Sequence, residues 1–292
     1  MSALFLAVVL PAWLIAQASV EPEPAATQET LEAAPVSVDT PPPIEETPRF
    51  AHTEMLFRPT QPWSIGTAYV LPNGRGEIGV FEPLRYGWGG RLELETHPIL
   101  DVVMPNVAVK KAWLLWVAGG VLSTRHNLTY PTGLLILLSR KGTGGILPHE
   151  TRVPAIVALN NEVYFTRPLV GEHLVTARLG AAVSVSFGRN TLPTIDLPFV
   201  FPRMAAYYHH FSSDLGADVR GPIWGPLSYD VEGEVFLMPD RTSTVAVEGG
   251  ALLIWQAATS FRAQVGARVG YSQLPFGSMW GWLPVADLIW AF

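Results

Sequence analysis

The fold is decided by residues 261–271, which read FRAQVGARVGY. Apolar or aromatic side chains occupy every odd position from Phe261 to Tyr271, and Arg, Gln or Gly occupies every even position. Side chains of a β-strand point alternately to its two faces, so this stretch predicts a strand with one apolar face and one polar face. Residues 175–187 repeat the pattern, with apolar side chains at all the odd positions and mainly Thr, Arg, Gly and Ser between them.

The alternation continues through most of the chain. It predicts strands at 63–71, 76–87, 90–97, 107–117, 120–131, 153–166, 172–187, 207–221, 227–238, 243–256, 260–274 and 282–292. A soluble β-sandwich also alternates, but soluble strands typically have about 5 or 6 residues, and many of these are longer. The polar face mixes Gly, Ser and charged residues, which suits the lumen of a barrel whose apolar face meets lipid. We therefore expect an all-β fold: a transmembrane antiparallel up-and-down β-barrel of about 12 strands, with a disordered N-terminal tail.

Composition excludes several classes of function. The 292 residues are 49% hydrophobic and only 15% charged, with a net charge of -6 and no cysteine. Without cysteine, the chain has no disulfides, thiolate metal sites or cysteine nucleophiles. The acidic balance gives no general basic surface for nucleic acid. We expect no cofactor, and the scattered histidines show no spacing typical of metal ligands.

The N-terminal region is expected to lie outside the barrel. Residues 1–18 are interpreted as a signal peptide, because the apolar run ends in Ala16-Gln17-Ala18, which fits a small-x-small cleavage site. The alternative is an uncleaved membrane anchor. Residues 19–50 are acidic and rich in proline, which predicts a disordered periplasmic tail. Residues 51–292 are assigned to the barrel.

The C-terminal residues carry a resemblance to a known class of proteins. The last expected strand ends at Phe292, and Ala286, Leu288 and Trp290 share its face. This resembles the C-terminal assembly signal of bacterial outer-membrane β-barrel proteins. The resemblance implies export to the outer membrane of a Gram-negative bacterium. It also implies contact with outer-membrane lipid and recognition by the barrel-assembly machinery through this strand.

Loop lengths and tryptophans predict an orientation. The expected connections alternate between short and mostly long, and in such barrels the short turns face the periplasm. Tryptophan prefers the membrane–water interface, so the tryptophans near the short turns are expected to form a ring around the barrel at that interface, called the girdle. They are Trp63, Trp88, Trp116, Trp224, Trp255 and Trp290. The alternative is that these aromatic residues fill a soluble core.

The polar face predicts the lining of the lumen. Its expected charged residues are Arg91, Glu93, Glu95, Arg178, Asp218, Arg220, Asp230, Glu232, Glu234, Glu248, Arg262 and Arg268. Because both signs occur, they indicate either a weakly selective channel or ion pairs that partly close the lumen. The leading hypothesis is a narrow, porin-like channel or transporter for small solutes. The alternatives are a structural or adhesive barrel that presents its outer loops, and a lipid hydrolase.

The hydrolase hypothesis depends on one segment. His210 and Ser212 are two residues apart and share a face of a strand, and known outer-membrane phospholipases use a Ser-His pair. Their parity directs them into the lumen, and no nucleophile-elbow motif accompanies them. No catalytic residue is therefore assigned, and an enzyme is the less favoured interpretation. The sequence does not indicate an oligomeric state.

Overall fold

The computed structural model describes residues 63–113, 120–140, 147–149, 151–189, 192–195, 197–239 and 244–292. The expected signal peptide and tail, and Trp116 of the expected girdle, lie outside these residues. None of the helices in the described part is long and apolar enough to cross a membrane.

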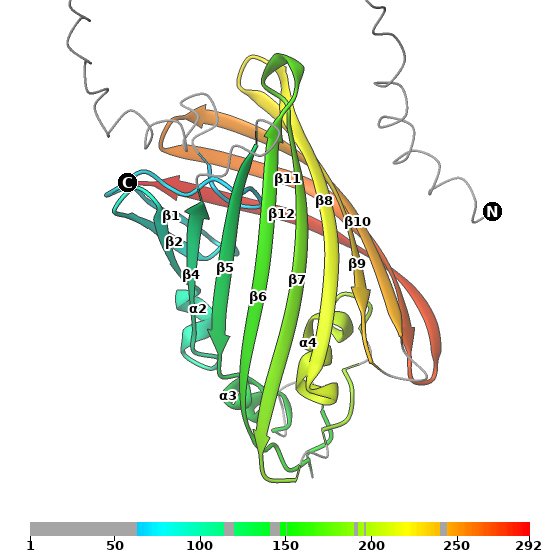
Figure 1. Ribbon diagram of the computed structural model, residues 1–292. Coiled ribbons are helices and arrows are strands. Elements are labelled where there is room, and N and C mark those ends of the chain that lie inside the picture. The colour runs from blue at the N-terminus through cyan, green and yellow to red at the C-terminus, as the bar shows by residue number, and fades with distance from the viewer. Residues whose placement is uncertain are drawn as a thin grey trace, which may run out of the picture. The chain divides into compact units, whose positions relative to one another are not determined.

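The described residues form twelve antiparallel strands that close into a barrel (Figure 1). Each strand pairs with its neighbours along the chain, and β12 closes the ring against β1. The strands are β1 Gly76–Gly79, β2 Leu84–Trp88, β3 Leu92–Thr96, β4 Asn106–Trp113, β5 Val121–Thr129, β6 Ala155–Pro168, β7 Leu174–Phe187, β8 Phe211–Trp224, β9 Leu227–Leu237, β10 Val245–Ala258, β11 Phe261–Leu274 and β12 Gly277–Ala291. The predicted all-β, twelve-stranded antiparallel barrel is confirmed.

The two ends of the barrel differ. Three short α-helices lie in the long connections at one end, which we call the loop end (Figure 1). They are α2 Pro98–Asp101, α3 Thr132–Leu138 and α4 Phe201–His209. The opposite end, called the turn end, holds the short β2–β3, β8–β9 and β10–β11 connections, the 3₁₀ turn η1 Val170–Glu172 and the C-terminus.

The first predicted strand is wrong. Residues 63–72 form no strand but lie inside the barrel, where Thr67, Ala68 and Leu71 are fully buried. A strand within the sheet would turn every second side chain to the outside of the barrel, whereas these side chains are enclosed. We call residues 63–72 the inner segment.

The second predicted strand, 76–87, is two strands, which restores the count of twelve. The chain reverses at residues 80–83 because the Asp287 carboxylate accepts hydrogen bonds from the backbone amides of Val80, Phe81 and Glu82. Pro83 follows, and its missing N–H suits a break in the ladder. The wall is therefore low on this side: β1 to β3 have 4 or 5 residues each, whereas β7 and β11 have 14.

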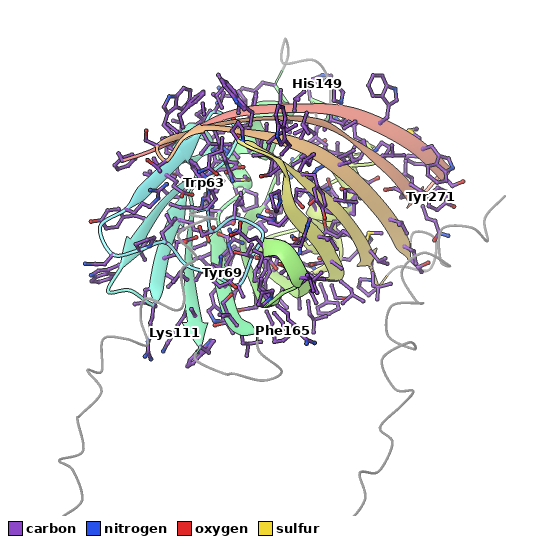
Figure 2. All side chains as sticks on the ribbon, turned by 90° about the horizontal axis from the view of Figure 1, so that it is seen from above. Trp63, Tyr69, Lys111, His149, Phe165 and Tyr271 are labelled. Carbon is purple, nitrogen blue, oxygen red and sulfur yellow. The ribbon has the colours of Figure 1, made fainter. Side chains whose placement is uncertain are left out.

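The barrel is apolar outside and polar inside. On β7, Leu179, Val183 and Val185 are exposed on the outer face, whereas Thr176 and Ser184 are buried on the inner face. Viewed along the barrel, Trp63 and Tyr69 lie inside the ring of strands, and Lys111 and Tyr271 lie outside it (Figure 2).

Candidate functional site

The inner segment fills the lumen near the turn end. Ala68, Tyr69 and Val70 pack with buried apolar residues of the wall, including Val121 of β5 and Leu174 of β7. The segment therefore has a small hydrophobic core of its own inside a polar barrel.

Wall side chains, rather than strand ladders, satisfy the backbone of this segment. Ala68 donates its N–H to Oγ1 of Thr166 at 2.7 Å, and Leu71 donates to Oε2 of Glu93 at 2.8 Å. The carbonyl of Ile65 accepts a hydrogen bond from Nη1 of Arg220 at 2.7 Å. Buried backbone groups left without partners are costly, so these contacts hold the segment in one position.

Two further contacts fix its beginning. Lys110 donates from Nζ to the carbonyl of Ser64 at 3.0 Å, and Arg85 donates to the Ser64 hydroxyl at 3.0 Å. Trp63 is buried at the β1–β12 junction, where it packs with Ile289 and donates to Gln256. This corrects the expectation that Trp63 belongs to an outward-facing girdle. The contacts to Lys110 and Arg85 require the inner segment to lie within the barrel.

The other girdle candidates lie on the outside, near the turn end. Trp88, Trp224, Trp255 and Trp290 have exposed fractions between 44% and 83%. On β12, Leu288 and Trp290 of the expected assembly signal are exposed on the outer face, and Ala286 is exposed beside them. The main chain of Phe292 pairs with Gly76 in both directions, which joins the end of β12 to the start of β1.

Most of the charged residues expected in the lumen line its inner surface. They are Glu93, Glu95, Arg178, Asp218, Arg220, Asp230, Glu232, Glu234, Glu248, Arg262 and Arg268. Arg91 is the exception, because it lies exposed in the turn between β2 and β3. The turn begins after Trp88, so the alternation of the strand no longer applies at that residue.

Ion pairs connect strands that are distant in the sequence. Arg125 of β5 bridges Glu95 of β3 at 2.8 Å and Glu162 of β6 at 2.7 Å. Sequence reasoning missed Arg125 and Glu162, although Glu162 shares its parity with the inward Tyr164 and Thr166 of the same strand. Pairing leaves few of these charges uncompensated, so removing one partner would leave a costly unpaired charge inside the barrel.

A second cluster lies at the junction of β1 and β12. Glu82 accepts from Arg85 at 2.8 Å and from Arg262 at 3.1 Å, and Arg85 also pairs with Glu77 at 3.1 Å. Arg85 and Glu77 are almost completely buried. This cluster strengthens a junction whose ladder contains only the pairs from Glu77–Ala291 to Gly79–Ile289.

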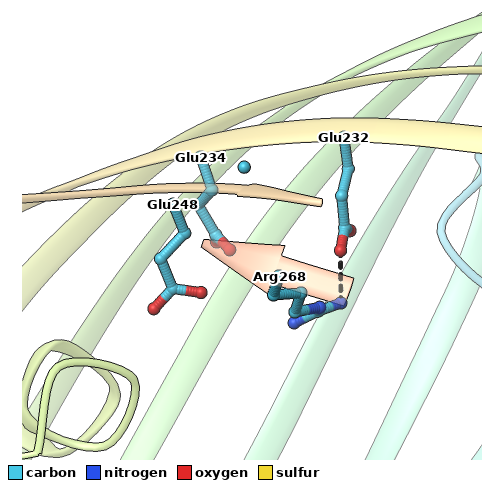
Figure 3. A pocket seen from close by; sticks show the side chains of 5 residues that line it. Glu232, Glu234, Glu248 and Arg268 are labelled. Carbon is cyan, nitrogen blue, oxygen red and sulfur yellow. Dashed lines mark ion pairs between the residues drawn. The ribbon is translucent and has the colours of Figure 1, made fainter. Parts of the chain in front are cut away.

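A polar chamber of about 340 Å³ lies between α4 and the inner faces of β6 to β9 and β11. That volume is at the lower end of the range of about 300–1,000 Å³ typical of small-molecule sites. Four carboxylates and three guanidinium groups line it: Glu162, Asp214, Glu232, Glu234, Arg178, Arg203 and Arg268. A close view shows Glu232 paired with Arg268, with Glu234 and Glu248 beside them (Figure 3). The chamber suits small polar solutes and has a slight excess of negative charge.

Helix α4 bounds the chamber toward the loop end. Its Arg203 pairs with Glu248 at 2.5 Å and with Glu234 at 3.5 Å, so it joins the helix to β10 and β9. Burial by itself lowers the pKa of Arg203, but the hydrogen bond and charge of Glu248, with the charge of Glu234, raise it above its ordinary value. The guanidinium therefore stays charged. Phe201 and Ala205 pack the helix into an apolar cluster with the wall.

The chemistry of a lipid hydrolase finds no support in this geometry. Ser212 is buried and lines the chamber, whereas His210 is exposed at the end of α4 in a left-handed conformation. No group of three His, Asp or Glu side chains among the described residues could hold a metal ion.

No protein-family model matches the chain, and no curated protein matches it by sequence.

Proposed function

We propose that this chain is an outer-membrane β-barrel that passes small polar solutes through its chamber. The observation that carries the proposal is the inverted distribution of polarity. Arg85, Glu77 and Glu93 are buried within the barrel, while the outer face exposes valines, leucines and tryptophans. Soluble proteins rarely expose contiguous apolar surface on this scale, whereas a lipid-facing barrel requires it.

The proposal includes the expected location. Strands β6 to β12 are long enough for a transmembrane strand, which needs about 9–11 residues. The exposed tryptophans at the turn end suit a membrane interface. Under this proposal, the protein is exported, β12 is the strand presented to the assembly machinery, and lipid surrounds the outer face.

A second candidate function is a structural barrel that presents its loops. It is favoured by the inner segment and the ion pairs, which together fill much of the lumen. A closed lumen serves such a barrel, because it needs no path for solutes.

Planar-bilayer recordings of the refolded full chain separate the two functions. For a solute path, we expect discrete conductance steps with weak cation preference, because the carboxylates outnumber the guanidinium groups around the chamber. Glu232→Gln removes one of these carboxylates and should shift selectivity toward anions. Arg91→Gln is the matched control, because Arg91 lies in an exposed turn and its replacement should leave selectivity unchanged.

The absence of conductance would contradict the transport function. If the folded barrel gives no steps, and none appears when Arg203→Ala removes the contact between α4 and the wall, the transport function is wrong. The structural function then replaces it.

A further inference from the structure

The wall of the barrel is incomplete beside β12. This strand has 15 residues and pairs with β11 from Gly277 to Trp290, but its other edge pairs with β1 only at residues 289–291. Val80 adds one hydrogen bond, to the carbonyl of Leu288. Among the described residues, no strand pairs with this edge between Gly277 and Ala286.

The orientation of the edge follows from hydrogen bonds at its closed end. Phe292 and Leu288 direct backbone groups toward β1, whereas the N–H of Ala291 points to Ser260 beside β11. In an antiparallel strand, successive residues direct their backbone N–H and C=O groups to opposite edges, and the register with β11 is continuous. The backbone of Pro284 therefore also faces the open edge. Proline lacks an N–H, and within sheets it is confined to such edges. Pro284 therefore suits an edge that receives no further strand, and it disfavours ladder pairing with a second copy of the chain.

The inner face of this half of β12 is apolar and partly exposed. Leu283 opposes the inward-facing Arg268 in the β11–β12 register, so its side chain also points inward. Leu283 and Met279 share this parity, and both are 45% exposed. Trp280 and Trp282 occupy the outer face and are 72% and 73% exposed. The apolar surface of the barrel thus continues around the open edge onto its inner side.

The same surface extends further into the barrel. Pro198 and Phe199, which precede α4, pack against the inner face of β12 at Gly281, where a Cβ atom would lie 3.1–3.2 Å from their side chains. Glycine at this position allows that close approach. Arg268, one strand away from Leu283, lines the polar chamber. An apolar path therefore runs from the open edge to the border of the charged chamber.

The opposite side of the gap is also apolar. Phe81 in the β1–β2 turn is 73% exposed, and Ile99 and Val102, at α2 and immediately after it, are 64% and 86% exposed. Free backbone groups are costly in hydrocarbon, so an open edge of this kind indicates that a cavity lies beside it. The gap combines such an edge with apolar side chains on both flanks.

We propose that this gap is a lateral opening through which the acyl chain of a membrane amphiphile reaches the inner face of β12, with its polar head at the chamber. The proposal rests on the placement of the barrel in a membrane that we propose above. It adds a second route to the chamber, from the bilayer, and a second class of ligand, amphiphiles with a single extended acyl chain.

Because the chain has no cysteine, a single thiol can be introduced at a chosen position by substitution. We would attach the fluorophore NBD to Leu283→Cys in the refolded full chain, in phosphatidylcholine vesicles containing acyl-chain doxyl lipid as the quencher. Leu253→Cys, on the outer face of β10, is the lipid-exposed control. Ala182→Cys, on the inner face of β7 and lining the chamber, is the lumen control. Met279→Cys provides a second position in case the label at Leu283 prevents folding.

The expected result is a loss of fluorescence at Leu283 comparable with that at Leu253, and little loss at Ala182. If Leu283 and Met279 behave like Ala182 while Leu253 is quenched, the barrel is in the membrane but acyl chains do not pass the edge. Water, or a second copy covering the edge, then fills the gap, and the lateral opening is refuted. If Leu253 is not quenched either, the membrane placement fails and the inference fails with it.

Discussion

Gly66 lies where the inner segment meets Arg220, and it has a left-handed backbone with φ of +68°. A Cβ atom at this position would lie 2.5 Å from Nη2 of Arg220. That guanidinium has little freedom to move, because it pairs with Asp230 at 2.8 Å and donates to the carbonyl of Ile65 at 2.7 Å. Gly66→Ala should therefore loosen the inner segment from the wall.

The size of the effect follows from two terms. A left-handed conformation costs a residue with a Cβ atom roughly 1–2 kcal/mol. Displacing Arg220 breaks a charge-assisted hydrogen bond to Ile65 worth about 1.5–3 kcal/mol. Their sum is about 3.5 kcal/mol, which corresponds to a few hundredfold in the equilibrium between the bound and released segment, at about tenfold per 1.4 kcal/mol.

Thiol labelling measures this equilibrium. Val70→Cys places a single cysteine at a buried position of the inner segment, and a maleimide reacts with it only when the segment is released. In the Val70→Cys background, Gly66→Ala should raise the labelling rate a few hundredfold. Gly74→Ala is the matched control, because Gly74 has φ of +81° but nothing within 4 Å of its Cβ position. Its backbone term alone, roughly 1–2 kcal/mol, allows an increase of about 5- to 30-fold. Equal rates in the two variants would refute the role assigned to Arg220.

Three further predictions concern contacts of α4, of the β1–β2 turn and of the inner segment. Arg203→Ala should enlarge the conductance step, because α4 loses its ion pairs with β9 and β10; an unchanged step would show that α4 does not limit the path. Asp287→Ala should lower the free energy of unfolding by about 2–4 kcal/mol, because three turn amides lose a charged acceptor, and an unchanged urea midpoint would contradict this. Thr166→Val should raise labelling of the Val70→Cys thiol roughly tenfold, because the buried N–H of Ala68 loses its acceptor, at a cost of about 1–3 kcal/mol. A rate unchanged from the background would show that this bond does not hold the segment.

The alternation of side chains was sufficient to predict most of the wall. In residues 174–187 and 261–274, polar and apolar positions follow the two faces of the sheet, so parity alone separates inside from outside. Each strand is constrained by its own sequence in this way, because a one-residue shift would move every side chain to the opposite face.

The contents of the lumen could not be predicted in this way. The inner segment is held by Thr166, Glu93 and Arg220, which are distant in the sequence, and no local pattern encodes such contacts. Its own residues are mainly apolar with some β-propensity, which explains why residues 63–71 read as a strand. The ion pairs present the same difficulty. The sequence shows that both signs occur, whereas the partners of Arg125 depend on which strands become neighbours.

The long connections were also underestimated. The alternation predicts a strand from residue 207 and a loop before it, but residues 201–209 form α4, whose Phe201 and Ala205 are buried against the wall. Nine residues are too few for helical periodicity to stand out beside long strands, and an isolated helix of this length is marginal without tertiary packing. The helix is stable here because the barrel supplies that packing and the ion pairs of Arg203.

The junction of β1 and β12 connects these observations. Within the ladder, the inward-facing Ile289 and Ala291 of β12 pack with Trp63 of the inner segment, and just beyond the ladder Asp287 accepts from the turn amides. Further along β12, where the ladder is absent, the inward positions become Leu283 and Met279. An inward apolar side chain is stable where protein covers it, as Trp63 covers Ile289, or where hydrocarbon reaches it. Ile289 is fully buried, whereas Leu283 and Met279 are both 45% exposed, and this difference is the physical reason to assign acyl chains to the gap.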